Sequence, residues 1–524
     1  MAQHNCIIVG SGINALVCAA ILAKKGNRVC VLERNDRFGG CIRSDEVTVP
    51  GFTHDVLSSW YPLFVTSPGF GVLQEDLAAR GVEFCNTDAP TAVVLPDNRH
   101  FVLTRDRAEN VRGMNALVPG DGDRYQQSMN ELMSTLDLTF TLLGSELWTW
   151  STARSLFKAL RKMGPHGMAQ FAGNAMQSCR AWLDQTIRSE EVRACLAPWP
   201  AHAGISPDAA ISGFMAKIIC FTLEAAGCPN VKGGSYRIVE AFRQIIEDNG
   251  GELHLNADVD RVLTAAGKAR GVRTAAGDEY LADKAVVCSV TPGQLYGRLL
   301  DATDVPDNVM QQAMDFQHGR ADMQIHLALD APPQWVDPAL AEVALVHLTP
   351  GLDGVSQAGT EADCGLLPRH GTVVVGQPTV LDPSRCPEGK AILWLQLQEL
   401  PSVIKGDAAG EIEAPANGEW TETVRERYAD RIVDRVAQHI PNLRQNIIGR
   451  AVFSPADLEA VNLNLTGGDP YGGACTLDQY FMWRPLRAVK NHETPVKQLY
   501  HIGASTHPGP GLGGGSGFLV ADLL

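Results

Sequence analysis

Between Cys6 and Glu33 the sequence reads CIIVGSGINALVCAAILAKKGNRVCVLE, an apolar run, a glycine turn, a helix-like stretch and a second apolar run that ends on an acid. Gly10 allows a tight turn, Gly12 lets the backbone approach a pyrophosphate, and Ala15 allows close helix–strand contact. The helix N-terminus offers unpaired N–H groups to phosphates. Glu33 follows Gly12 by 21 residues, where a carboxylate can accept hydrogen bonds from ribose hydroxyls. The segment predicts a dinucleotide-binding unit.

The next residues indicate which dinucleotide is bound. Arg34 alone is consistent with a partner for the 2′-phosphate of NADP, but Gly39-Gly40 permits a second close backbone approach along a longer cofactor. The order E-R-x4-G-G resembles a flavoprotein superfamily in which a Rossmann fingerprint precedes this segment, and that resemblance implies FAD. Cys41 follows the glycine pair, so a covalent flavin link is an alternative to the non-covalent binding that we expect.

Composition narrows the class of protein. The 524 residues are 45% hydrophobic and 20% charged, which is enough for two to four folded domains. The net charge of −15 disfavours nucleic acid and strongly anionic membrane surfaces as general partners. The 13 cysteines contain no C-x-x-C, and the 14 histidines contain no H-E-x-x-H. We therefore expect reduced thiols and no metal site.

The start of the chain and its hydropathy suggest a compartment. The first strand begins by residue 6, which leaves no room for a signal peptide. The longest purely apolar run, Ala15–Ala23, has nine residues and is too short to span a bilayer. We expect a soluble cytoplasmic protein, with peripheral contact with a membrane left open.

Two further segments complete the predicted nucleotide-binding fold. A helix at 236–249 leads into strand-like runs that end at Cys288, and the strand-like Leu499–Ile502 runs into a glycine-rich loop and a short helix at 518–524. The predicted class is α/β, a discontinuous Rossmann-type FAD-binding domain with an inserted α+β substrate domain, like glutathione reductase and amine oxidase flavoproteins. The FAD-binding domain is predicted at 1–60, 231–299 and 489–524, and the substrate-binding domain at 61–230 and 300–488.

The two insertions show both helical and alternating patterns. Helices are predicted at 125–135, 145–162, 168–188 and 209–226, and strands at 99–103, 323–329 and 391–397. Within 138–163, Trp148, Trp150 and Phe157 alternate with basic residues such as Arg154 and Lys158. Such a segment can lie on a membrane surface; the interpretation that we favour is a helix that covers the substrate pocket.

Three separated segments resemble one family, the phytoene dehydrogenase-related flavoproteins, which include carotenoid desaturases, carotenoid ketolases and pyridine nucleotide-disulfide oxidoreductase domain 2-like proteins. The matching motifs are the N-terminal fingerprint, the 232–288 segment, and the run from Gly467-Gly468-Asp469 to the terminal His507-Pro508-Gly509 loop. By position, the resemblance implies FAD contacts from Gly10, Gly12, Asn14, Ala15, Glu33, Arg34, Gly39, Gly40, Arg43, Val259, Gly503, Ala504, Thr506, His507, Pro508, Gly511, Leu512, Gly513 and Gly514.

Candidate catalytic residues are few, because the flavin carries the hydride step and the protein supplies position and a proton acceptor. His507 in the terminal loop is the first candidate, and His54 and His202 are the others; each has a structural alternative, in loop anchoring or packing. The predicted substrate pocket consists of Trp60, Tyr61, Trp199, Tyr480, Trp483 and Arg484, for which core packing or a structural ion pair is the alternative.

The resulting expectation is an FAD-dependent oxidoreductase that oxidises or desaturates a hydrophobic or cyclic small molecule, with oxygen or a quinone as electron acceptor. Three alternatives stay open at this stage: a redox-neutral double-bond isomerase, an amine oxidase, and a flavin-binding scaffold without turnover. Nucleic acid is not an expected partner, and a homodimer stays open.

Overall fold

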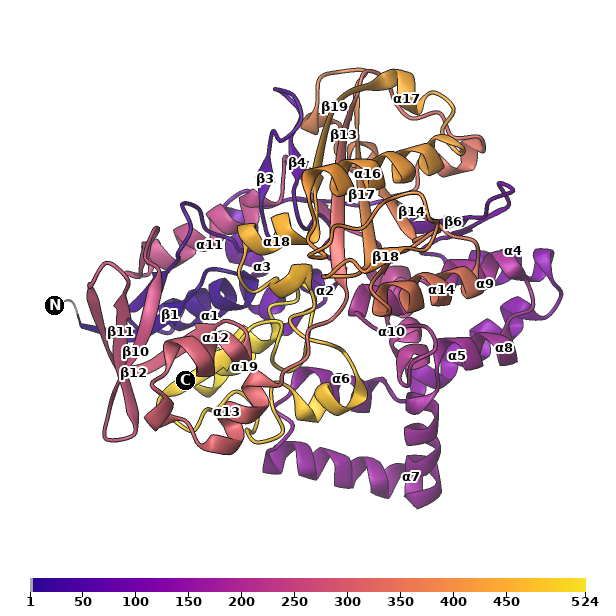
Figure 1. The fold of residues 1–524 in the computed structure, drawn as a ribbon. Helices are drawn as coiled ribbons and strands as arrows, with labels where there is room; N and C mark the ends of the chain where they lie inside the picture. Colours follow the sequence, from indigo (N-terminus) through magenta and orange to yellow (C-terminus); the bar gives the residue numbers. More distant parts are fainter. Residues whose placement is uncertain (1–2) are drawn as a thin grey trace.

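The computed structural model describes residues 3–524, and its first sheet unites strands from three distant parts of the chain (Figure 1). The strand order is β10-β11-β12-β1-β2-β9, with β20 paired to the second half of β12. β1, β2, β9, β12 and β20 run parallel to their neighbours in this part of the sheet. The bounds are β1 Gln3–Val9, β2 Val29–Leu32, β9 Glu252–His254, β10 Val259–Ala265, β11 Lys268–Thr274, β12 Glu279–Ser289 and β20 Leu499–Ile502.

Helix α1 (Ile13–Lys24) is apolar on all sides because it is covered on all sides. It packs between the first sheet, α11 (Tyr236–Asp248) and the terminal helix α19 (Gly515–Leu523). A Cβ added at Gly517 would lie 1.8 Å from the carbonyl oxygen of Asn14. Glycine is therefore required at this position for α19 to approach α1, and the two ends of the chain are held together there.

The second sheet has the order β19-β13-β17-β16-β14-β6-β7. Its outer face carries the odd-numbered residues of β13 and packs against Val424, Tyr428 and Val433 of α16 (Glu422–Ala437), which lies across the strands in Figure 1. Its inner face packs against α10 (Ser212–Ala226) and the 3₁₀ turn η1 (Trp199–Ala203). The strands are β6 Thr91–Val94, β7 His100–Leu103, β13 Ala321–Leu329, β14 Leu345–Leu348, β16 Val373–Gly376, β17 Ala391–Leu400 and β19 Ile447–Phe453.

Further helices and short strand pairs complete the fold. The remaining helices are α2 Pro62–Val65, α3 Pro68–Ala79, α4 Arg107–Leu117, α5 Asp121–Ser134, α6 Leu136–Gly144, α7 Trp150–Met176, α8 Cys179–Thr186, α9 Glu190–Leu196, α12 Pro292–Gln294, α13 Asp307–Met314, α14 Leu352–Asp363, α15 Pro378–Leu381, α17 Leu443–Asn446 and α18 Pro455–Val461. Short strand pairs are β3 Ser44–Asp45 with β4 His54–Asp55, β5 Phe84–Cys85 with β8 Asn230–Val231, and β15 Leu366–Leu367 with β18 Gly406–Asp407.

Several predicted boundaries shift. The strand-like runs predicted before Cys288 include one long strand, β12, which extends to Ser289, and the terminal helix predicted at 518–524 begins at Gly515. The helices predicted at 145–162 and 168–188 become α7 and α8, with a break at Gly164 (φ 72°) before Pro165 inside α7. The Ser178 hydroxyl accepts from the Ala181 N–H and starts α8. The Ser178 cap and the Gly164-Pro165 pair mark these boundaries in the sequence, but a prediction from apolar periodicity alone does not take them into account.

A buried ion-pair cluster fastens the two sheets. Arg385, 1% exposed, contacts Asp55 at 2.8 Å and Asp382 at 3.2 Å, and it also donates to the side chain of Asn230. Asp55 belongs to the β3–β4 ribbon, which follows the nucleotide motif in sequence, whereas Arg385 belongs to the second insertion. The strands of the first sheet come only from the segments predicted for the FAD-binding domain; the domain boundaries themselves stay predictions.

Three observations bear on the expectations from composition. None of the helices within residues 3–524 is long and apolar enough to cross a membrane. Each of the 13 cysteines is unpaired, and the described chain contains no cluster of three or more histidine, cysteine or acidic side chains that could hold a metal ion.

Candidate functional site

A cavity lies at the carboxyl ends of β1 and β2, where α1 begins. Parallel sheets of this kind bind ligands at such an edge. Gly10, Gly12, Glu33, Arg34 and Gly40 line it, as the sequence predicted. It is also lined by residues from the second and third segments, among them Val259, Ser289 and Asn464.

Glu33 is fixed by the turn that it faces. Its Oε2 accepts from the backbone N–H of Ser11 at 3.1 Å and from the Ser11 hydroxyl at 2.6 Å. Its Oε1 accepts from the N–H of Asn35 at 2.9 Å. The Ser11 hydroxyl also accepts from the N–H of Gly39 at 3.0 Å. Ser11 therefore joins the glycine turn, the acid and the Gly39-Gly40 segment, a role that its place between two glycines did not reveal.

The surroundings of Gly12 show whether the residues of this cavity suit a dinucleotide. Its backbone (φ −65°, ψ 170°) is open to any residue, and an added Cβ would meet no atom of the chain within 4 Å. Neither strain nor packing within the chain explains a glycine here. A pyrophosphate that approaches the start of α1 does explain it, because the backbone N–H groups must come close to phosphate oxygens. The cavity fits the ADP part of FAD.

The rim of the cavity contains residues that sequence reasoning missed. Asp258 lies 4.0 Å from the Arg34 guanidinium and 3.6 Å from that of Arg298. Asn464 donates to the Ser289 carbonyl at 3.0 Å and accepts from the Thr291 N–H at 3.2 Å. A signal was available for Asn464, since it shortly precedes the Gly467-Gly468-Asp469 motif.

The Gly-Gly-Asp motif itself supports a loop. The buried Asp469 carboxylate accepts from the N–H groups of Gly319 at 2.8 Å, and of Tyr471 and Gly473 at 2.7 Å.

Cys41, near the Gly-Gly pair, receives a 3.4 Å contact from the amide of Asn462, and burial raises the pKa of its thiol to about 11. A protonated thiol is a poor nucleophile, which supports the expected non-covalent binding.

His507 stands in the terminal loop that connects β20 to α19. Its ring is buried and lies near the backbone of Ser145 and of Leu142, but within residues 3–524 neither ring nitrogen makes a hydrogen bond of good geometry. Burial, followed by the nearby His492, lowers the pKa of His507 to about 3. The imidazole is therefore neutral at physiological pH. An unpartnered buried imidazole in a well-packed loop indicates a group that meets something the chain does not supply.

The same loop is connected to the segment between α6 and α7. The ring Nε2 of His492 lies 2.9 Å from the carbonyl oxygen of His507, and its Nδ1 lies 2.6 Å from Glu146 Oε1. Trp148 packs on Trp483 with ring centroids 6.1 Å apart, and the indole N–H of Trp148 donates to the Met482 carbonyl at 3.1 Å. The α6–α7 segment therefore contacts the predicted pocket wall.

Tyr480 and Arg484 lie beside this loop. A Cβ at Gly509 would approach the Tyr480 ring to 2.9 Å, so the tyrosine lies directly against the terminal loop. The buried Arg484 donates to the carbonyl oxygens of Tyr471 at 2.6 Å and of Gly473 at 3.2 Å, and its guanidinium lies 5.2 Å from the Tyr480 ring. Arg484 thus supports the 471–475 loop and the tyrosine through backbone carbonyls rather than through the ion pair expected as the structural alternative, and its contact with a substrate stays a prediction.

His202 belongs to a different cluster, on the inner face of the second sheet. Its Nε2 lies 2.9 Å from His347 Nε2, its Nδ1 lies 3.1 Å from the Gln398 amide, and its ring stacks on Trp199 at 4.6 Å. Burial lowers the pKa of His202 to about 4 and that of His347 well below its usual value. The two neutral imidazoles share one proton between facing nitrogens.

His54 is placed between the β3–β4 ribbon and the second sheet. Its Nε2 lies 2.7 Å from the Thr48 hydroxyl, and its ring meets the edge of His326 at 5.2 Å. Burial lowers its pKa to about 2. No hydrogen bond in the described chain joins His54 or His202 to His507, so the three candidate bases do not form one constellation.

The predicted aromatic pocket is divided in the same way. Tyr61 is fully buried in the core beneath the first sheet, whereas Trp60 and Trp394 both contact the space at Gly376 in the second sheet. The roles predicted for Asn14, Ala15, Arg43, Gly503, Ala504, Thr506, Pro508, Leu512 and the other candidates stay predictions. Asn14 and Ala15 are buried in the first turn of α1, and Arg43 lies 3.6 Å from Asp45.

The inner face of the second sheet is polar as well as buried. Asp322 on β13 accepts from the Gln396 amide at 2.5 Å, from the Gln324 amide at 3.3 Å and from the Met323 N–H at 2.9 Å. Burial raises its pKa to about 8, so this acid is protonated at neutral pH. Sequence reasoning missed Asp322, His347 and Gln398, because only strand pairing brings them together.

Known proteins match this chain along its length. Residues 16–511 match the family model for flavin containing amine oxidoreductase. Pyridine nucleotide-disulfide oxidoreductase domain-containing protein 2 of Rattus norvegicus is 25% identical, with 100% of this chain and 93% of the relative covered. A limonene dehydrogenase chain of Castellaniella defragrans is 24% identical (100% and 94% covered), and zeta-carotene-forming phytoene desaturase of Myxococcus xanthus is 26% identical (97% and 90%). These relatives confirm the resemblance predicted from the motifs.

Solved structures share the fold. An oxidoreductase from Methanosarcina mazei aligns with a TM-score of 0.64 at 16% identity, covering 100% of both chains. Putrescine oxidase bound to putrescine aligns with a TM-score of 0.61 at 16% identity, covering 99% of this chain and 98% of that one. The predicted fold class, an α/β flavoprotein of the amine oxidase type, is confirmed.

Proposed function

This chain belongs to the flavin-containing amine oxidoreductase family and is an FAD-dependent oxidoreductase; from this premise, we propose that it oxidises or desaturates a hydrophobic or cyclic organic substrate. When bound, FAD supplies the hydride acceptor. Oxygen or a quinone would take the electrons onward. Two relatives are named for limonene and phytoene, which are apolar hydrocarbons.

The unpartnered ring of His507 carries the proposal. It lies in the loop predicted to approach the flavin, and it is neutral because burial lowers its pKa to about 3. A neutral imidazole can accept a hydrogen bond or a proton, but it gives no charge with which to hold an ionic substrate. With the Tyr480 ring beside the loop, such a site suits a carbon–hydrogen bond in an apolar molecule.

The test is anaerobic mixing of the yellow holoprotein with three substrate sets: polyenes, cyclic terpenes and ketones, and primary amines. We expect loss of absorbance near 450 nm with the first or second set, together with a product that is two hydrogens lighter. Bleaching by amines alone would contradict the proposal and favour an amine oxidase. Product formation of unchanged mass without any acceptor would favour an isomerase. No bleaching by any compound would favour a scaffold.

We also propose that α7 brings the protein to a lipid surface, where an apolar substrate would be dissolved. Thr152 is the single buried residue of this 27-residue helix, which lies at the edge of the molecule in Figure 1. Trp150 is 88% exposed and Phe157 is 59% exposed. Their spacing places them with Leu160 on one stripe, next to a stripe formed by Arg154, Lys158 and Arg161. Neighbouring apolar and basic stripes are typical of interfacial helices.

Vesicle flotation tests this placement. The wild-type holoprotein should float with vesicles of phosphatidylcholine and phosphatidylglycerol, and W150S/F157S should stay in the soluble fraction. The matched control M314S/V403S removes two apolar side chains, each 54% exposed, from other surfaces, and should float like the wild type. If the W150S/F157S variant floats equally well, α7 is not the membrane contact. If it instead converts a dimer to a monomer in size-exclusion chromatography, α7 is a homodimer interface.

A further inference from the structure

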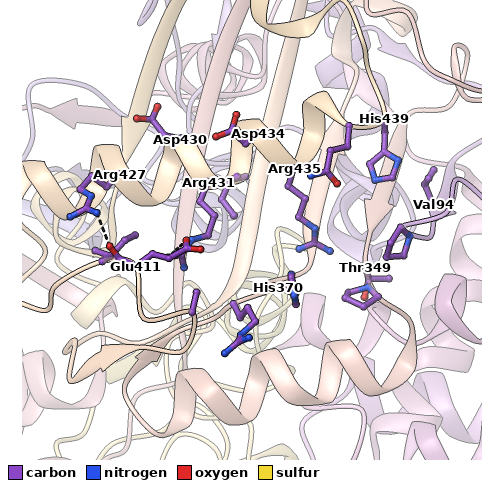
Figure 2. Close-up of a pocket in the computed structure, with 17 residues that line it drawn as sticks. Val94, Thr349, His370, Glu411, Arg427, Asp430, Arg431, Asp434, Arg435 and His439 are labelled. Atoms are coloured by element: carbon purple, nitrogen blue, oxygen red, sulfur yellow. Dashed lines mark hydrogen bonds and ion pairs between the residues drawn. The ribbon is translucent and has the colours of Figure 1, made fainter.

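A second cavity, of about 680 Å³, lies beneath α16 on the outer side of the second sheet (Figure 2). It shares no lining residue with the nucleotide cavity. Its walls come from α16, the chain after β14 at Thr349, and the segments around His370 and Glu411. A volume of this size accommodates a small organic ligand.

The helix sorts its charges to opposite sides. Arg431 and Arg435, one turn apart on α16, point toward His370 in Figure 2, whereas Asp430 and Asp434 point to the opposite side of the helix. Asp430 lies 2.5 Å from Arg450, and Asp434 pairs with Arg444. Both carboxylates also line the cavity, but each is paired with an arginine outside the lining, so they match little of the charge of the lining arginines.

Three of the lining arginines, Arg369, Arg427 and Arg435, form no ion pair in the described chain, and Arg427 donates to the carbonyl oxygen of Glu411 at 2.6 Å. The half-buried Arg435 guanidinium donates to the carbonyl oxygens of Gly371 and of Leu348, the latter at 3.3 Å. Arg369 donates to the carbonyl oxygen of Ala408 at 2.7 Å. Arg431, by contrast, is matched by Asp407 at 2.6 Å and Glu411 at 3.2 Å. Removing an arginine charge from water without a counter-ion is costly, and carbonyl dipoles compensate it only in part.

The neighbouring histidines respond to this excess of positive charge. Burial lowers the pKa of His370, and the charges of Arg435 and Arg369 lower it further. Burial and then Arg435 lower the pKa of His439, whose Nδ1 lies 2.7 Å from the Asn98 amide oxygen. A neutral imidazole has one N–H; that of His439 donates to Asn98, so only His370 can donate to an anion.

We propose that this cavity binds an organic anion, whose phosphate or carboxylate group is held between Arg369 and Arg435 and whose apolar body lies along Pro350 and Ile432. Guanidinium groups bind both anion types with paired N–H donors. The bound anion would supply the counter-charge that the chain omits. The cavity shares no lining residue with the nucleotide cavity and contains none of the predicted catalytic residues, so the inference stands whatever the substrate of the flavin proves to be.

Thermal unfolding of the holoprotein tests the inference, with 10 mM inorganic phosphate or octanoate compared with the same ionic strength of chloride. A ligand at many times its dissociation constant raises the midpoint by roughly 2–4 °C for a protein of this size. A rise with phosphate identifies a phosphate ligand, and a rise with octanoate identifies a carboxylate ligand. The rise should vanish in R435M and in R369Q, and persist in R487M, which removes an exposed ion pair with Asp478 outside the cavity lining.

The two arginine variants distinguish the loss of anion binding from a loss of folding. Arg369 is exposed, so R369Q should keep its flavin absorbance and unliganded midpoint even if R435M folds poorly. The absence of a shift with both probes in the wild type would overturn the proposal. So would an equal shift in R369Q and the wild type, because the anion would then bind elsewhere.

Discussion

The two sheets form sites of opposite kinds. At the edge of the first sheet, the cavity is shaped by backbone and small residues: Gly12 leaves open space, and Ser11 ties Glu33 to the turn. On the inner face of the second sheet, the polar groups belong to side chains, such as those of Asp322 and His347, which are buried and neutral. Substitutions in the first sheet should therefore affect cofactor retention, and those in the second should affect stability and substrate handling.

The largest effect is expected from removing the buried Arg385 ion pairs, which connect the segment after the nucleotide motif to the second insertion. R385M removes the charge that pairs with Asp55 and Asp382 and leaves two buried carboxylates that keep their neutral hydrogen-bond donors but have no counter-ion in the described chain. We expect the free energy of unfolding to fall by about 3–5 kcal/mol. Denaturant unfolding measures it. R444M, which removes an exposed pair with Asp434, should cost at most about 1 kcal/mol; equal losses in both variants would show that Arg385 does not clamp the sheets.

The second effect separates cofactor binding from folding. G12V adds a side chain where the chain itself has room, so only a bound pyrophosphate should oppose it. Overpacking of about 1–3 kcal/mol weakens FAD binding about tenfold to a hundredfold. Flavin content after dialysis, read from the 450 nm to 280 nm ratio, checks this. The control G71A, also without a neighbour within 4 Å, should keep its flavin. Full flavin content in G12V would refute the assigned cradle.

The third effect concerns the buried acid of the second sheet. Because burial raises the pKa of Asp322 to about 8 from an ordinary value near 3.8, the folded protein binds a proton that the unfolded chain has released. Its stabilisation is complete below about pH 4 and is lost as the pH rises through 8. Between pH 6 and 8 the wild type should lose about 1–2 kcal/mol relative to D322N. Parallel pH profiles for the two proteins would contradict a protonated Asp322.

The difference between the sheets also explains what sequence could predict. The glycine turn, Glu33 and Gly40 are close in sequence, so their spacing alone predicts a shared cavity. Asn464 reaches the same cavity from a distant segment, and its role depends on tertiary contacts. The same holds for the pairing of His202 with His347, which requires η1 to meet β14. Residue type singled out His202, but its partner came only from the fold.

The candidate bases illustrate the same limit. The sequence ranked His507 first, for its place in the terminal loop, and left His54 and His202 as further candidates. The structure gives His54 Nε2 a partner in Thr48, leaves its Nδ1 without one, and gives both nitrogens of His202 a partner, whereas neither nitrogen of His507 makes a hydrogen bond of good geometry. These hydrogen bonds favour structural roles for His202 and His54, and they concentrate the mechanistic proposal on the terminal loop.

We propose that the first sheet retains the flavin and that His507 takes part in the reaction. The rate of anaerobic flavin reduction in H507N separates these two roles most directly. With the substrate that bleaches the wild type, we expect H507N to contain one FAD per chain and to reduce it at least about a hundredfold more slowly, the lower end of the effect of losing a proton acceptor. An unchanged reduction rate in fully flavinated H507N would contradict the account.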